Sequence, residues 1–204
     1  MFRQTLRRFK TLTPGFDVVA GQWVNPSNRV AKFAKTSGIG FPDELRLVPR
    51  LRPNDYHVRI SVSPKHVFSG YHVKYFNPNE HPLIEKLLYL YTQDHKAKPL
   101  WSYVHAAAFD GARSVVRTNS ERMARKAFIH AMRALGYDSY GRTLDGRRDD
   151  LYGTIRLQIN DPKILLNAEF DSVVEVLKTS FTTHAIPRLK ENASPVRDFR
   201  RSRG

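Results

Sequence analysis

The chain has 204 residues, of which 34 are Lys or Arg and 19 are Asp or Glu, and this gives a formal net charge of +15 at pH 7. It contains no cysteine, which excludes a disulfide framework, a cysteine-ligated zinc site, an iron–sulfur cluster and a thiol nucleophile. Hydrophobic residues make up 41% of the chain, which is typical of a globular protein with a packed core.

The excess of positive charge predicts a polyanionic partner, because a basic surface releases condensed counterions when it binds nucleic acid. Arginine supplies 22 of the 34 cations. Guanidinium binds phosphate through two parallel hydrogen bonds and stacks on bases, whereas lysine acts as a hydrated point charge. The alternative interpretation is that the charge only keeps the protein soluble.

Residues 1–16 are basic and carry no acid. Phe2, Leu6 and Phe9 fall on one stripe of a helical projection, and the opposite side holds Arg3, Arg7, Arg8 and Lys10. We therefore predict a basic amphipathic helix of the kind found in mitochondrial transit segments. The alternative is a basic arm that lies on nucleic acid or on an anionic membrane surface.

Residues 17–53 are predicted to form an extended or irregular connector. Its regular parts are a short strand at 18–24 and one or two helical turns at 29–35. Pro49 and Pro53 exclude a regular helix or central strand over residues 45–53. No apolar run approaches the roughly 20 residues of a membrane-spanning helix, so no transmembrane segment is expected.

Residues 54–187 are predicted to form an α+β core. Strict alternation places Tyr56, Val58, Ile60 and Val62 on the buried face of a strand, and residues 70–76 are expected to pair with it. A helix follows over residues 82–91, with four apolar side chains facing inward: Leu83, Leu87, Leu90 and Tyr91.

The second half of this core repeats the mixture of strands and helices. A strand at 100–108 is expected to turn at Asp110-Gly111 into a strand at 113–117, and a helix then runs from 121 to 135 and ends at Gly136. A strand at 151–159, a helix opened by Asp161-Pro162 and a helix at 172–181 complete the pattern. The predicted fold class is α+β, with mainly antiparallel strands covered by two to four helices.

Basic residues gather around the helix at 121–135 and in the two ends of the chain. The predicted RNA-binding residues of the core are Arg113, Arg117, Arg122, Arg125, Lys126, Arg133, Arg142, Arg147 and Arg148. The basic tail, residues 188–204, adds Arg197, Arg200, Arg201 and Arg203. Tyr137 and Tyr140 would supply rings for stacking on bases. The alternative is an ordinary solvated helix face.

Signatures of catalysis are missing from the sequence. It lacks a Walker-type phosphate loop, a dinucleotide-binding glycine motif, a zinc-protease motif and a nucleophile elbow. His57, His66 and His72 lie close together in the sequence but have no obvious carboxylate partner. We therefore predict no catalytic residues, no metal site, no cofactor and no small-molecule substrate.

The composition predicts a structural RNA-binding component of a ribosome, and the amino-terminal segment favours the mitochondrial ribosome in the matrix. Its expected partners are ribosomal RNA and neighbouring ribosomal proteins. One alternative is a metal-dependent RNA-processing enzyme built on Asp145, Asp149 and Asp150, since clustered carboxylates hold the metals of two-metal nucleases. Another is a peripheral subunit of a mitochondrial inner-membrane complex, bound to lipid through the amino-terminal helix.

Overall fold

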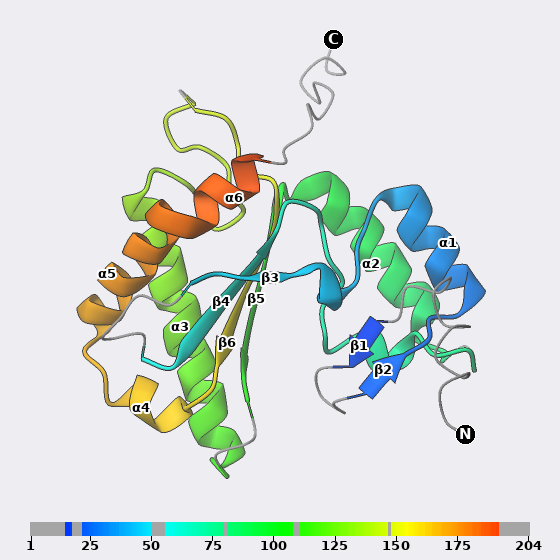
Figure 1. Cartoon of the computed structure of the whole chain (residues 1–204), viewed down its shortest axis with the longest axis horizontal. Helices are drawn as coiled ribbons and strands as arrows, with labels where there is room; N and C mark the ends of the chain where they lie inside the picture. Colours follow the sequence, from blue (N-terminus) through cyan, green and yellow to red (C-terminus); the bar gives the residue numbers. More distant parts are fainter. Residues whose placement is uncertain are drawn as a thin grey trace, which may run out of the picture. The chain divides into compact units, whose positions relative to one another are not determined.

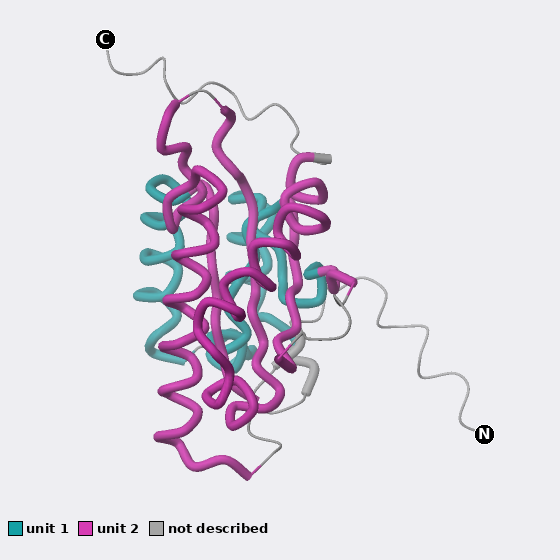
Figure 2. Tube along the Cα trace, turned by 90° about the vertical axis from the view of Figure 1, so that its left-hand side faces the viewer, with its two compact units in different colours: residues 1–45, 65–98 teal, residues 46–64, 99–204 magenta. Residues whose placement is uncertain are grey.

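The computed structural model describes residues 15–17, 22–49, 56–79, 81–107, 111–146 and 148–191. The chain divides into two compact units, which Figure 2 distinguishes by colour. Unit 1 consists of residues 1–45 and 65–98, and unit 2 of residues 46–64 and 99–204. The second half of unit 1 is therefore inserted in the sequence between two segments of unit 2.

Unit 2 is built on a four-stranded mixed sheet with the strand order β3-β4-β6-β5. Its strands are β3 (Arg46–Leu47), β4 (Val58–Ser63), β5 (Leu100–Ala106) and β6 (Gly153–Ile159). β4 runs antiparallel to β3 and to β6, whereas β5 and β6 are parallel and joined by a helical crossover. The predicted α+β class with a mostly antiparallel sheet is confirmed.

Alternation along the strands decides which face of the sheet is apolar. Val58, Ile60 and Val62 of β4 are buried, as predicted, and so are the side chains that lie in register with them on β6. These three residues of β6 are Ile155, Leu157 and Ile159. Successive strand residues point to opposite faces, so the other face of the sheet takes the polar positions.

The helices of unit 2 lie on the apolar side of the sheet, as Figure 1 shows. They are α3 (Ser114–Ala134), α4 (Pro162–Leu166), α5 (Phe170–Ser180) and α6 (Ile186–Glu191). α3 packs on α5 as well as on β5 and β6. The rings of Phe128 on α3 and Phe181 meet edge to face at 5.6 Å, inside a core that excludes water.

Residues Phe181–Ala185 form a π-helical segment between α5 and α6. The N–H of Ile186 donates to the carbonyl of Phe181, five residues back. The next residue, Pro187, has no N–H, and in an α-helix its ring would clash with the carbonyl of Thr183. The wider turn therefore accommodates proline and keeps Phe181 and Ala185 buried.

Unit 1 combines a small antiparallel pair, β1 (Gly15–Asp17) with β2 (Gln22–Val24), and short helices. The helices are α1 (Asn28–Ser37), α2 (Ile84–Ala97) and two 3-10 turns, η2 (Pro42–Glu44) and η3 (Val73–Tyr75). Phe68 is fully buried at its centre, with the rings of Phe41, Phe76 and Tyr91 at 5.3, 4.9 and 4.8 Å. This aromatic cluster gives unit 1 a core of its own.

The predicted strand at 70–76 is wrong. Residues 73–75 form η3, and β4 pairs with β3 and β6 instead. The N–H groups of Tyr75 and Phe76 donate to carbonyls three residues back. Val73 and Phe76 are both buried, which matches the three-residue turn of a 3-10 helix. Tyr71 and Val73 would share one face of the predicted strand, but Tyr71 is 43% exposed whereas Val73 is buried.

The predicted strand at 113–117 is also wrong, because α3 begins at Ser114. β5 lies at the edge of the sheet and pairs with β6, so the expected hairpin between residues 100–108 and 113–117 is not formed. Glu121, the first residue of the helix as predicted, lies within α3 and accepts the N–H of Ala106 through Oε1 at 2.8 Å. Val115 and Val116 suggested a strand by their β-branching, but Val115 is 67% exposed on the first turn of α3.

The predicted helices at 29–35, 82–91, 121–135 and 172–181 are confirmed, with differences at their ends. On α2, the prediction that Leu83 and Leu90 face inward is wrong, since both are exposed and Ile84 and Leu88 are buried instead. Within the described residues, no helix combines the length and the apolarity needed to cross a bilayer.

Candidate nucleic-acid interface

Helix α3 carries five of the nine predicted RNA-binding residues of the core. It ends in a Schellman motif, in which the N–H of Gly136 donates to Arg133 and that of Tyr137 to Met132. Gly136 has a φ of 84°, a left-handed conformation that favours glycine. At about 1.5 Å per residue the 21 residues of α3 extend about 31 Å.

The two sides of α3 differ sharply in chemistry. Its buried side consists of Ser120, Ala124, Ala127, Phe128, Ala131 and Met132, which pack into the core of unit 2. Its solvent side carries four exposed cations, Arg122, Arg125, Lys126 and Arg133, which we call the α3 basic face. At about 100° per residue, Arg122, Lys126 and Arg133 fall within about 40° of one another, and Arg125 lies beside them.

No carboxylate of the described residues forms an ion pair with the α3 basic face. Ion pairs elsewhere in the described residues join Arg29 to Glu85, Lys65 to Glu44, Lys98 to Asp94 and Lys178 to Glu175. The acid on α3 itself, Glu121, is bound to the backbone of β5. Like charges four residues apart, such as Arg122 and Lys126, cost a helix about 0.2–0.5 kcal/mol, so this face is electrostatically unfavourable until an anion binds.

The other predicted cations around α3 have different surroundings. Arg113 is exposed at the residue before α3, and Arg117 is half-buried within its second turn. Arg148 donates from Nη1 to the carbonyl of Leu135 at 3.2 Å, so it caps the carboxyl end of α3. Arg142 is exposed in a turn whose N–H groups bind Asp138. Arg148 therefore has a structural contact that the sequence pattern did not indicate.

The remaining predicted RNA-binding residues lie outside the described residues. They are Arg3, Arg7, Arg8, Lys10, Arg147, Arg197, Arg200, Arg201 and Arg203. Their part in binding stays a prediction, as does the amphipathic helix proposed for residues 1–16, of which the structure describes only Gly15 and Phe16, in β1.

The two tyrosines predicted to stack on bases are not equivalent. Tyr137 is buried, with 2% exposure, because it closes the Schellman motif against the core. Tyr140 is 44% exposed in the turn that Asp138 organises, where Asp138 Oδ1 accepts the N–H of Tyr140 at 2.7 Å. Only Tyr140 of this pair offers an exposed ring.

The acidic loop that suggested a metal-dependent enzyme does not gather its carboxylates in the described residues. Asp150 Oδ1 accepts the N–H of Thr143 at 3.0 Å and thereby closes the loop. Asp145 and Asp149 are exposed. Among the described residues, no group of three His, Asp or Glu side chains converges as metal ligands would.

The polar face of the sheet holds a half-buried arginine and a buried histidine that the sequence pattern did not reveal. Arg156 on β6 donates from Nη2 to Ser61 Oγ at 3.3 Å, and its Nε is buried without a hydrogen bond to the described residues. His105 on β5 is 7% exposed. Burial, with the nearby charge of Arg156, lowers the pKa of His105 to about 4, and burial also lowers the pKa of Arg156. Strand alternation was the signal that could have placed both on this face.

Three histidines of unit 1 form two side-chain pairs, in which His66 is buried and His72 and His95 are half-buried. Nδ1 of His66 and Nδ1 of His95 are 2.7 Å apart, so one ring donates and the other accepts, which requires at least one neutral imidazole. His72 Nδ1 lies 2.7 Å from the hydroxyl of Tyr91, which also accepts the N–H of Ser69. Burial lowers the pKa of His95 and of His72, where Lys74 adds to the effect.

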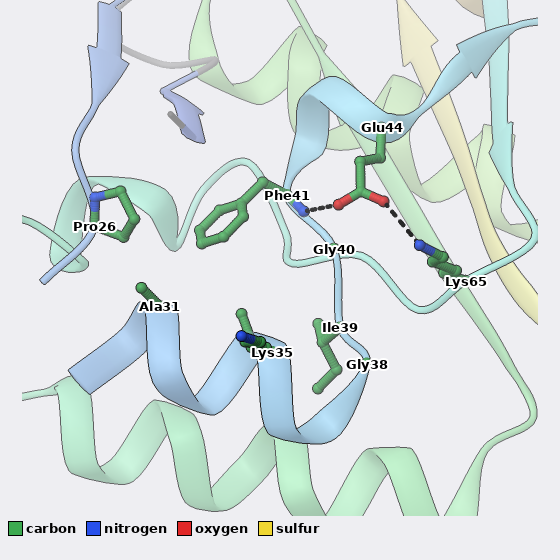
Figure 3. A pocket seen from close by; sticks show the side chains of 10 residues that line it. Pro26, Ala31, Lys35, Gly38, Ile39, Gly40, Phe41, Glu44 and Lys65 are labelled. Atoms are coloured by element: carbon green, nitrogen blue, oxygen red, sulfur yellow. Dashed lines mark hydrogen bonds and ion pairs between the residues drawn. The ribbon is translucent and has the colours of Figure 1, made fainter. Parts of the chain in front are cut away.

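A cavity of about 440 Å³ lies in unit 1 beside the carboxyl end of α1 (Figure 3). The carboxylate of Glu44 accepts the N–H of Phe41 at 3.2 Å and pairs with Lys65 at 3.7 Å. A Cβ at Gly40 would lie 2.5 Å from Glu44 Oε1, so only glycine leaves room for this carboxylate. Glu44 therefore has a structural explanation in the fold of residues 40–44.

Comparisons with protein-family models, with curated proteins and with solved structures find no match.

Proposed function

We propose that this protein is a structural RNA-binding component of a ribosome, and of the mitochondrial ribosome in the matrix. The observation that supports this proposal is the α3 basic face, whose cations are exposed and lack a carboxylate partner among the described residues. A net charge of +15 adds a long-range attraction to RNA. In this role the protein neutralises RNA phosphates and contacts neighbouring ribosomal proteins.

The mode of binding follows from the residue types. Arg and Lys contact phosphates, which position a protein on RNA without reading its sequence. Each phosphate contact releases counterions, so the affinity must fall steeply as salt is added. Asp150 and the three histidines of unit 1 have structural partners, and the proposal assigns no catalytic step to them.

The proposal is tested by sedimentation of the tagged full-length protein from a mitochondrial extract, with RNase or EDTA added to parallel samples. We expect the protein to migrate with one ribosomal subunit, to stay with that subunit in EDTA and to leave it after RNase. Migration of the wild-type protein as a species near its own 23.5 kDa, unchanged by RNase, would contradict the proposal.

A charge variant connects this behaviour to α3. In one protein, Arg122, Lys126 and Arg133 are each replaced by Gln, and in the matched control Lys32, Lys86 and Lys163 are replaced by Gln. The control removes the same charge from exposed positions on α1, α2 and α4. We expect the α3 variant to leave the subunit at a lower salt concentration than the control. Equal release of the two variants would show that α3 is not the contact.

A further inference from the structure

The exposed side of α3 carries uncharged hydrogen-bonding groups beside its cations. Thr118 and Asn119 are exposed and lie one turn before Arg122. Neither side chain forms a hydrogen bond to the described residues, whereas Thr36, Thr92, Thr179 and Thr182 each donate to the carbonyl four residues back in their own helix. Thr118 and Asn119 thus keep a donor and an acceptor directed away from the fold.

The same side of α3 has no platform for stacking on unpaired bases. Phe128 is the one Phe, Tyr or Trp within the helix, and it is buried. His130 packs edge-on against the ring of Phe170 at 5.3 Å. Proteins that bind single strands place aromatic side chains where successive bases stack, and α3 lacks them. This face is therefore better matched to paired RNA than to a single strand.

The dimensions of α3 restrict how paired RNA could bind it. An α-helix with its side chains is about 10–12 Å wide, and the major groove of A-form RNA is too narrow for side chains to read. The minor groove is wide and shallow and displays the 2′-hydroxyls, which both donate and accept hydrogen bonds. Arg122 and Arg133 are about 16 Å apart along the helix axis, so cations lie along most of its carboxyl-terminal half.

We propose that α3 lies on the minor groove of double-stranded RNA, with Arg122, Lys126 and Arg133 on phosphates and Thr118 and Asn119 on 2′-hydroxyls. This inference rests on the proposed RNA-binding function and names the form of RNA that α3 recognises. Because DNA lacks the 2′-hydroxyl, the two polar residues distinguish RNA from DNA, whereas the cations bind both.

The test measures the fluorescence anisotropy of labelled probes with the full-length protein at 50, 100 and 200 mM KCl. Affinity that depends on phosphate contacts falls steeply over this range of salt. The probes are an RNA duplex of about 20 base pairs, the DNA duplex of the same sequence and one RNA strand alone. An RNA duplex of this length is long enough to present two successive minor grooves. We expect the RNA duplex to bind at least tenfold more tightly than either other probe.

Two variants separate the polar contacts from the charges. Thr118→Val with Asn119→Ala should weaken RNA-duplex binding about tenfold and leave DNA-duplex binding unchanged. The matched control, Thr179→Val with Asn167→Ala, alters the same residue types on the exposed surface of unit 2 and should bind like the wild type. Replacing Arg122, Lys126 and Arg133 by Gln should weaken both duplexes and lower the salt slope by about 0.9 for each lost phosphate contact.

The outcomes also distinguish this inference from the proposed function. If the single strand binds as tightly as the RNA duplex, or if the polar variant weakens RNA and DNA equally, the inference is overturned while RNA binding stands. If none of the RNA probes binds at 50 mM KCl, the proposed function fails together with the inference.

Discussion

Arg122 and Arg156 belong to the same unit and differ only in the surface that carries them. Arg122 lies on the exposed side of α3, where water solvates its charge and no carboxylate of the described residues pairs with it. Arg156 lies on the polar face of the sheet, where burial lowers its pKa and that of the neighbouring His105. The exposed arginine is suited to binding an anion, whereas the half-buried one affects the stability of the fold.

The largest effect expected from this comparison is a loss of stability in acid. The pKa of His105 is about 4 in the folded protein and 6.5 in the unfolded chain, so between these pH values the unfolded chain takes up a proton that the folded protein does not. The free energy of unfolding should fall by about 3 kcal/mol as the pH drops from 7 to 4, through His105 alone. The lowered pKa values of His72 and His95 act in the same direction.

Urea denaturation at pH 7 and at pH 4 measures this loss, and His105→Gln provides the comparison. The variant has no proton to bind, so its stability should depend less on pH than that of the wild type. An equal pH dependence in the two proteins would show that His105 titrates normally in the folded state.

Replacing Arg156 by Met should have a smaller effect on stability. The variant loses one hydrogen bond to Ser61 but no longer buries a charge, so the free energy of unfolding should change by no more than about 1 kcal/mol. Removal of the positive charge should also raise the pKa of His105 toward its ordinary value. NMR titration of the His105 ring protons tests this, and an unchanged pKa would assign the whole shift to burial.

Arg148→Gln tests an exposed arginine with a structural contact. The guanidinium hydrogen bond to the carbonyl of Leu135 lies at the surface, so its loss should cost about 0.5 kcal/mol. Thermal denaturation at neutral pH gives the measurement. Amide hydrogen exchange should report faster opening of the last turn of α3, and unchanged protection there would contradict the capping role.

Arg122→Ala should have the smallest effect on the fold. The side chain is exposed and makes no hydrogen bond to the described residues, so the free energy of unfolding should stay within about 0.5 kcal/mol of the wild type. The salt slope of RNA-duplex binding should nevertheless fall by about 0.9. If Arg122→Ala lowered the free energy of unfolding and left the salt slope of RNA-duplex binding unchanged, Arg122 would act in stability and not in binding. That result would contradict the proposed contrast with Arg156.

Local sequence patterns were enough to predict the features that depend on near neighbours along the chain. The alternation of Val58, Ile60 and Val62 identified β4, Gly136 marked the end of α3, and Asp161 with Pro162 marked the start of α4, whose first N–H groups Asp161 accepts. The charge of +15 and the cations of α3 follow directly from the residue types. Periodicity and capping act over a few residues, so one segment contains all the information needed.

Which segments pair and pack together could not be predicted from local patterns, because it depends on contacts between distant parts of the chain. The parallel pairing of β5 with β6, the contact of Phe76 with Phe68 and Tyr91 and the contact of Glu121 with β5 all join residues that are not neighbours in the sequence. The contrast between Arg122 and Arg156 arises in the same way, because burial depends on which face the rest of the chain covers. The polar partners of a half-buried side chain, such as Ser61 for Arg156, come from another strand and are set by sheet register.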